Sequence, residues 1–320
     1  MAISWLTAAQ QFLRLETGEV PLTPGRTVYL LKMKFGDGLR AAWYRDVVRP
    51  QILAAVPLEL PEDKSCEIHA LTSGDDWLNL VWALRSFAFF SGRQYALCIH
   101  DDGTLTDDAV GQLEVAFPHA RLISRREADD RLRPVLSDLP RCSALRATNK
   151  LAPKVFDFAF FLEADRLILL DSDILFFAPP TALLNALRDP AFCKNTLNKD
   201  WGAGYTIDLE KTRALLDFDL PPMINSGLGL LHRASLRFDW VEEFLGLPDI
   251  LSHSHQIEQT LIALCSARFG FEMLPTEYDV HLGPHRPGAP IRHYTGPIRH
   301  LMFSEGIRSL ARQGFLKSAN

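Results

Sequence analysis

One apolar stretch in the middle of the chain limits the folds that this sequence can adopt. Residues 167–177 read LILLDSDILFF, so aliphatic residues lead into Asp171-Ser172-Asp173 and further apolar residues follow. A continuous apolar run of this length predicts a strand buried on both faces of a mostly parallel sheet. Because side chains alternate along a strand, this prediction places Asp171 and Asp173 on one side and Ser172 on the other.

Two carboxylates at the end of a buried strand need a positive partner, because an unpaired buried charge is costly. A hard divalent cation, Mg²⁺ or Mn²⁺, takes oxygen ligands and commonly keeps phosphate oxygens in its shell. Ligands of open α/β sheets collect at the carboxyl ends of the strands, where Asp171 and Asp173 are expected. The pair is therefore a candidate metal site. A second Asp-x-Asp, at 217–219, precedes two prolines and is interpreted as a polar loop.

The segments on both sides of this run alternate between strand and helix patterns. Further strands are predicted at 67–72, 95–100, 120–124 and 224–231, and helices at 77–88, 106–116, 154–161, 181–188, 239–246 and 256–268. Alternation of this kind predicts an α/β fold, with a mostly parallel sheet and helices on both faces. The charged segment 125–142 is expected to be an exposed crossing, and 191–220 is expected to be irregular.

The start of the chain is expected to form an extension that packs on the main domain. A short helix is predicted over 3–15, and a half-exposed strand over 27–35, where apolar residues alternate with lysines. Residues 61–64, PEDK, are interpreted as a connector. The chain is therefore predicted to comprise an N-terminal extension, one main domain and a tail, at 1–64, 65–306 and 307–320.

Composition excludes some classes of protein. The chain has 34 Lys and Arg against 39 Asp and Glu, and this net charge of −5 offers no basic surface for nucleic acid. Its 5 cysteines are scattered without a Cys-x-x-Cys pair, which favours a reducing compartment over a zinc site or a disulfide framework. The first residues lack a signal-peptide pattern, and charges interrupt every apolar run. We expect a cytoplasmic protein without a transmembrane segment. No oligomeric state is predicted.

Further motifs follow one another along the chain. Residues 71–77 read LTSGDDW at the end of a predicted strand, Asn225-Ser226-Gly227 opens a glycine-rich strand, and residues 293–299 read HYTGPIR. With Asp171-Ser172-Asp173 and Glu258-Gln259, this ordered set resembles the GT-A fold nucleotide-sugar glycosyltransferases, and within them the family-8-like retaining enzymes. The resemblance covers residues 65–306.

This resemblance implies a metal-dependent enzyme that moves a hexose from a nucleotide sugar, most simply a UDP-hexose, to an acceptor that the sequence does not name. Retention of the sugar's configuration is implied as well. Mn²⁺ or Mg²⁺ would be held by Asp171, Asp173 and His293. The nucleotide sugar would be bound by Thr72, Asp76, Lys154, Asp171, Gly296 and Arg299. The residues expected to act at the reacting sugar are Asn225, Glu258 and Gln259.

The sequence departs from the family pattern in three places. Arg299 stands where the family has lysine, which keeps the positive charge and adds a bidentate grip on phosphate. Glu258 stands where the family has aspartate, and the tryptophan that usually follows the last motif is missing. Residues 281–306, rich in histidine, glycine and proline, are expected to form a loop that closes over the donor. His253 and His255 are expected at the surface.

Two other interpretations remain open. Phosphatases of the haloacid-dehalogenase type also place Asp-x-Asp after an apolar strand, and Asp171 would then be a nucleophile that forms an aspartyl-phosphate. That motif normally opens its domain, whereas here about 100 residues with strand and helix patterns precede it. The second alternative is a protein that binds a nucleotide sugar without turning it over. Metal-dependent release of UDP would separate these possibilities.

Overall fold

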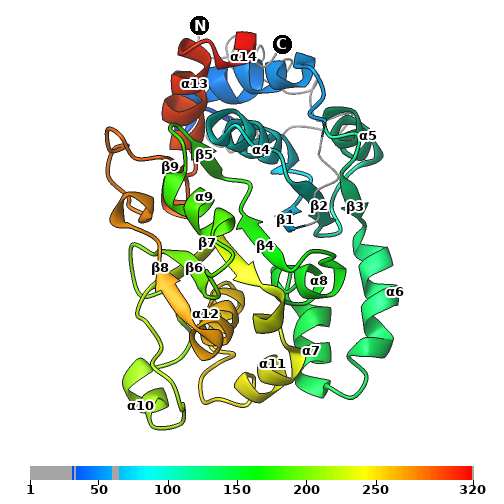
Figure 1. Ribbon diagram of the computed structural model, residues 1–320. Helices are drawn as coiled ribbons and strands as arrows, with labels where there is room; N and C mark the ends of the chain where they lie inside the picture. Colours follow the sequence, from blue (N-terminus) through cyan, green and yellow to red (C-terminus); the bar gives the residue numbers. More distant parts are fainter. Residues whose placement is uncertain (1–30, 32–33, 60–64, 319–320) are drawn as a thin grey trace, which may run out of the picture.

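The computed structural model describes residues 31, 34–59 and 65–318, and its centre is a seven-stranded sheet (Figure 1). The strands lie in the order β3-β2-β1-β4-β7-β6-β8. Their bounds are β1 (Cys66–Thr72), β2 (Ala96–Asp101), β3 (Arg121–Ile123), β4 (Arg166–Leu170), β6 (Asn195–Lys199), β7 (Ile224–His232) and β8 (Phe271–Met273). Strands β3, β2, β1 and β4 are parallel, β7 is antiparallel to β4 and β6, and β8 is parallel to β6. The predicted mostly parallel sheet is confirmed.

Helices cover both faces of this sheet, as predicted. One apolar cluster lies beneath helices α4 (Trp77–Ser91), α5 (Asp107–Ala116) and α9 (Thr181–Arg188). The other lies beneath helices α7 (Pro140–Thr148), α8 (Pro153–Phe161), α11 (Phe238–Phe244) and α12 (Ile257–Phe269). Strand β4 serves both clusters, because Ile168 and Leu170 point into the first while Leu167 and Leu169 point into the second. This double burial explains the unbroken apolar run of β4.

The second half of that run lies in a different sheet, so the prediction of one continuous strand was wrong. Strand β4 ends at Leu170, and the chain turns at Ser172 and Asp173. Strand β5 (Ile174–Phe176) then pairs antiparallel with β9 (Ile291–His293), which forms a separate two-stranded sheet. Both halves are apolar because both are fully buried, and the pattern alone does not distinguish one long strand from two short ones.

Two other segments are more regular than expected. The charged segment 125–142 contains all of α6 (Arg125–Val135) and the start of α7. Ala128 and Leu132 are buried, while charged residues such as Arg131 and Arg133 face outward. The segment 191–220 contains β6 and α10 (Leu209–Arg213). The many charged residues of 125–142 predicted an exposed connection. A helix at the surface needs only one apolar face, so the same charges are compatible with a helix.

The described residues before β1 are mostly helical. Residues 31, 34 and 35 are helical rather than in the predicted strand, because an apolar spacing of four suits a helix as well. The rest of that strand and the predicted helix over 3–15 lie outside the described residues. Helical segments α3 (Leu39–Trp43), η1 (Tyr44–Val48) and η2 (Arg49–Ala54) pack beside α4 and the late segment η6 (Met302–Ile307), at the top of Figure 1.

The remaining elements complete the late part of the chain. Their bounds are η3 (Arg233–Ser235), η4 (Thr276–Tyr278), η5 (Gly296–Ile298), α13 (Arg308–Arg312) and α14 (Phe315–Ser318). Within the described ranges, no helix combines the length and the apolar character that crossing a membrane requires.

Candidate active site

A cavity of about 500 Å³ lies where β1, β2 and β4 end and where β7 begins. This size is in the range of small-molecule sites, and the position is the strand-end edge at which α/β sheets bind ligands. Every site residue predicted from the sequence lines it: Thr72, Asp76, Lys154, Asp171, Asp173, Asn225, Glu258, Gln259, His293, Gly296 and Arg299. Ser172 also lines the cavity, since the turn after β4 ends the alternation expected of a strand.

The predicted metal ligands converge on one point. Nε2 of His293 lies 3.0 Å from Oδ1 of Asp173 and 4.0 Å from Oδ2 of Asp171. Ligand atoms of the three side chains lie within 4.8 Å of one another, so they could hold a metal ion together. Pairing of β5 with β9 causes this meeting, because it sets Ile174 opposite His293 directly after the Asp-x-Asp turn.

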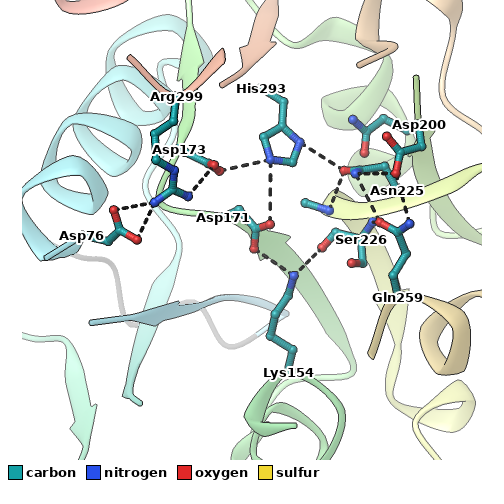
Figure 2. A network of polar contacts seen from close by, with 12 residues as sticks. Asp76, Lys154, Asp171, Asp173, Asp200, Asn225, Ser226, Gln259, His293 and Arg299 are labelled. Carbon is teal, nitrogen blue, oxygen red and sulfur yellow. Dashed lines mark hydrogen bonds and ion pairs between the residues drawn. The ribbon is translucent and has the colours of Figure 1, made fainter. Parts of the chain in front are cut away.

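Asn225 determines which nitrogen of His293 faces the carboxylates. Nδ1 of His293 lies 3.1 Å from Oδ1 of Asn225, and this amide oxygen also accepts a hydrogen bond from the backbone N–H of Gly227 at 2.9 Å. Since an amide oxygen only accepts, Nδ1 carries the proton and Nε2 points at the two aspartates (Figure 2). A metal-binding histidine is held in this way, with its second nitrogen donating to a fixed acceptor. Two carboxylates and one imidazole could therefore hold a divalent cation, and the imidazole suits Mn²⁺ better than Mg²⁺.

The carboxylates of Asp171 and Asp173 also attract His293 electrostatically. Burial lowers the pKa of His293, but the charges of Asp173 and Asp171 outweigh it and raise that pKa above its usual value. Burial opposes ionisation of Asp173, yet His293 and Arg299 hold its pKa well below the usual range. Asp173 is therefore ionised, and His293 tends to be protonated while no metal neutralises the aspartates.

Arg299 bridges two acidic groups at one side of the cavity. Its Nη2 donates to Oδ2 of Asp173 at 2.6 Å, and its Nη1 donates to the carboxylate of Asp76 at 2.6 and 2.7 Å (Figure 2). The two aspartates raise the pKa of Arg299, although burial lowers it. The guanidinium thus occupies part of the coordination space of Asp173.

Lys154 lies at the floor of the cavity, on the first turn of α8. Its Nζ is 2.9 Å from Oδ1 of Asp171, 3.1 Å from Oε1 of Glu258 and 2.9 Å from the carbonyl oxygen of Ser226. Burial lowers the pKa of Lys154, but the two carboxylates raise it. Burial raises the pKa of Glu258, which is only 3% exposed. Glu258 is therefore a buried member of this charged cluster.

Two amide side chains form the side of the cavity opposite Arg299 (Figure 2). Oε1 of Gln259 accepts from Nδ2 of Asn225 and from the backbone N–H of Ser226, both at 3.2 Å. Nε2 of Gln259 donates to Oδ2 of Asp200 at 3.0 Å and to the carbonyl of Gly204 at 3.0 Å. Asn225 also donates to Asp200, at 3.3 Å. The amide pair is thereby held in one orientation.

Sequence reasoning missed Asp200. Its segment was expected to be irregular, so nothing marked it as the residue that follows a strand. Asp200 directly follows β6, and the end of β6 pairs with the start of β7, where Asn225 lies. A strand prediction for 195–199 would have placed Asp200 near Asn225. Asp200 is not in the cavity lining itself; the lining residues that were not assigned a role include Ser73, Asp102, Lys150 and Leu151. His255 is exposed, as expected, but it also borders the cavity.

Two of the residues expected to contact the nucleotide border space that a ligand could fill. Thr72 is 3% exposed, at the end of β1, and its hydroxyl has no partner. A Cβ built on Gly296 would meet no atom within 4 Å, so this backbone borders open space. These placements are compatible with the predicted contacts.

Comparison with known proteins gives no match to a family model and none to a curated protein. Solved structures do match. They include mouse xyloside xylosyltransferase 1, at 14% identity over 74% of this chain and 99% of that chain, with a TM-score of 0.49. Galactosyltransferase LgtC with donor and acceptor sugar analogs matches at 13% identity over 77% and 95%, with a TM-score of 0.46. The mannosyltransferase Ktr4p of S. cerevisiae with GDP matches at 9% identity over 69% and 75%, with a TM-score of 0.43.

These three neighbours are glycosyltransferases, the class that the sequence motifs resemble. At TM-scores below 0.5 the likeness identifies no substrate for this chain. What the cavity does has to be inferred from its own side chains.

Proposed function

We propose that the protein is a metal-dependent glycosyltransferase that moves a hexose from a nucleotide sugar, most simply a UDP-hexose, to an acceptor hydroxyl. The observation that carries this proposal is the convergence of Asp171, Asp173 and His293 on one point, with Arg299 on one side and the amides of Asn225 and Gln259 on the other. In this proposal the three groups would serve, in order across one cavity, as a cation site, a diphosphate site and a sugar site.

The first part of the reaction is the departure of the nucleoside diphosphate. Asp171, Asp173 and His293 would hold Mn²⁺ or Mg²⁺, and the ion would offset the negative charge that develops on the leaving group. Arg299 would turn from Asp173 to the diphosphate, where its planar guanidinium can donate two hydrogen bonds. Lys154 pairs with Asp171 and would hold that carboxylate in place. Such fixed charges favour the transition state because they need no reorganisation during the reaction.

The second part is the attack of the acceptor, for which we propose retention. The bond between the anomeric carbon and the diphosphate oxygen breaks, and the acceptor oxygen bonds to the same face of that carbon. The acceptor proton passes to an oxygen of the leaving diphosphate. Asn225 and Gln259 would hold the sugar hydroxyls and face the charge that develops on the ring. Glu258 would act through Lys154, because both of its oxygens already contact Lys154 or Ser226.

The proposal is tested with a panel of nucleotide sugars in the presence and absence of Mn²⁺. A bound donor should raise the melting temperature by mass action, and a competent enzyme should release nucleoside diphosphate slowly even with water as acceptor. Stabilisation without release would indicate the binding protein of the second alternative. Metal-dependent release of phosphate from simple phosphate esters, lost in Asp171→Asn, would instead indicate the phosphatase. Asp102→Asn is a control that leaves the predicted metal ligands intact.

A further inference from the structure

We propose that Arg49, which precedes the main sheet in the chain, is a positioning residue for the nucleotide: it orients Asn79, and Asn79 holds the carboxylate of Asp76 at the cavity. This inference rests on the proposed function and goes beyond it by giving the segment 34–54 a part in donor binding. Arg49 itself does not line the cavity, whereas Asp76 does. The effect of Arg49 therefore has to pass through other side chains.

A chain of hydrogen bonds leads from η2 across the first turn of α4 to the predicted metal site. Nη1 of Arg49 donates to Oδ1 of Asn79 at 2.9 Å, and Nδ2 of Asn79 donates to Oδ1 of Asp76 at 3.0 Å. The carboxylate of Asp76 accepts from Nη1 of Arg299 at 2.6 and 2.7 Å. Nη2 of the same guanidinium donates to Asp173 at 2.6 Å (Figure 2). Arg49 is thereby connected to a predicted metal ligand.

Asn79 can transmit an orientation because its amide has one donor end and one acceptor end. A guanidinium only donates and an ionised carboxylate only accepts, so Oδ1 of Asn79 faces Arg49 while Nδ2 faces Asp76. Asn79 is 2% exposed, so water does not compete for its amide. Without Arg49, the amide could turn over, and its hydrogen bond to Asp76 would no longer be specified.

Arg49 is itself fixed by contacts with three elements. Its Nε donates to the carbonyl of Arg45 in η1 at 3.2 Å, and its own carbonyl accepts from Nε1 of Trp82 in α4 at 2.9 Å. The guanidinium lies 5.3 Å from the ring centroid of Phe303 in η6, within the range of a cation–π contact. Burial lowers the pKa of Arg49, and the charge of Asp76 is among those that raise it. The position and charge of Arg49 are therefore suited to orient Asn79.

Asp76 depends on this support because its carboxylate does not cap the helix that it precedes. It occupies the N-cap position of α4, where a carboxylate commonly accepts from the backbone of the first turn, but it makes no such hydrogen bond. Its partners are instead the side chains of Asn79 and Arg299. In the proposed function Arg299 would turn toward the diphosphate, and Asn79 would then keep Asp76 in place for the nucleotide.

The test measures the binding of UDP and of GDP in the presence of Mn²⁺ by calorimetry, and the wild-type protein shows which nucleotide binds. Arg49→Met should weaken that nucleotide about fivefold, the effect of one hydrogen bond. Arg49→Lys should recover part of the affinity, because an ammonium group also donates. Asn79→Asp keeps an acceptor for Arg49 but removes the donor to Asp76. It should therefore weaken the nucleotide at least as much, although the contact that attaches the segment remains.

Two further measurements separate positioning from attachment. In an Asp76→Ala chain, Arg49→Met should cause no further loss of affinity, because the carboxylate through which it acts is gone. Arg45→Met is the matched control and should bind the nucleotide as the wild type does, because Arg45 contacts Asp46 and the carbonyl of Lys34 within the same segment. Unfolding of the nucleotide-free variants is measured alongside, since lost attachment alone lowers stability without changing affinity.

An unchanged affinity in either Arg49→Met or Asn79→Asp would overturn the inference and leave the proposed function intact. A loss in Arg49→Met that persists in full in the Asp76→Ala chain would overturn it as well. If Arg49→Met does not fold, Asn79→Asp decides the matter, because it keeps the partner of Arg49. A wild-type protein that binds neither nucleotide with Mn²⁺ would contradict the proposed function, and the role of Arg49 would fall with it.

Discussion

Nη2 of Arg299 lies 2.6 Å from Oδ2 of Asp173, one of the carboxylates that a divalent cation would use. Without a metal, this guanidinium supplies the positive charge that the buried carboxylate requires. Metal binding and the contact between Arg299 and Asp173 therefore compete. If the proposed metal and donor bind, Arg299 would be free to turn toward the diphosphate, and metal binding would be coupled to donor binding through this side chain.

Arg299→Met tests this competition. Removal of the guanidinium should strengthen the binding of Mn²⁺ alone several-fold, because Asp173 no longer has a competing partner. The affinity for UDP in the presence of Mn²⁺ should fall about tenfold, because a charge-assisted contact to phosphate is lost. Electron paramagnetic resonance of free Mn²⁺ measures the first effect and calorimetry the second. Arg299→Lys is the control. Weaker binding of Mn²⁺ to Arg299→Met would refute the competition.

Asp173→Asn should abolish metal-dependent turnover, because one of the proposed ligands is lost. It should also lower the free energy of unfolding of the metal-free protein by about 1–3 kcal/mol, since His293 and Arg299 lose a buried ionised partner. The side chain of Arg299 is 39% exposed, so water screens its pairing with Asp173. The expected loss is therefore smaller than for a fully buried ion pair. Denaturant unfolding with a chelator present measures it. Turnover at the wild-type rate in Mn²⁺ would remove Asp173 from the site.

Lys154→Met should destabilise the protein by about 3–5 kcal/mol, because it leaves the carboxylates of Asp171 and Glu258 without their shared cation. Glu258→Gln in the same chain should recover part of that loss, since one of the two unpaired charges is then neutral. Chemical unfolding of both single variants and the double variant measures the coupling. Strictly additive losses would show that Glu258 does not depend on Lys154.

The pH dependence of stability should come in part from two core histidines. His69 and His100 are fully buried, with Nδ1 of His69 3.0 Å from Nε2 of His100. Burial lowers the pKa of both, so the folded state stays neutral where the unfolded chain takes up protons. Their contribution is present above the unfolded pKa of 6.5 and is lost as the pH falls below it.

His100→Leu should therefore reduce the loss of unfolding free energy between pH 6.5 and 5 by about 1–2 kcal/mol. Denaturant titrations at several pH values measure this slope. His253→Gln is the control, because His253 is exposed. An unchanged slope in His100→Leu would show that His100 takes up its proton in the folded state.

The transferred sugar should keep the donor's α configuration. Inversion would need a carboxylate base beside the acceptor hydroxyl, and Glu258 is buried beneath Lys154. Glu258→Gln should then slow the reaction moderately and leave the anomer unchanged. Proton NMR of the product from an α-linked donor decides between the outcomes. A β linkage would refute retention and would make Asp200, which borders Gln259, the candidate base.

Local patterns in the sequence determined the elements and many of the chemical groups. The apolar run before Asp171 predicted a strand buried on both faces, because burial on two sides requires an unbroken apolar stretch. Carboxylates at a strand end predicted a cation site, and the late HYTGPIR motif added His293 and Arg299 through its resemblance to a family. These inferences needed only periodicity, residue chemistry and motif order.

Tertiary structure alone decided how the groups meet. The strand after Asp173 pairs with a segment more than a hundred residues later, and that pairing brings His293 to the aspartates. Asp76 contacts Arg299 across 223 positions, and Asp200 contacts Gln259 across 59. A residue's own neighbours in sequence set its burial pattern, but a hydrogen-bond partner is chosen by how distant segments pack. The sequence therefore predicted neither the contact of Asp200 with Gln259 nor the division of the apolar run 167–177 between two sheets.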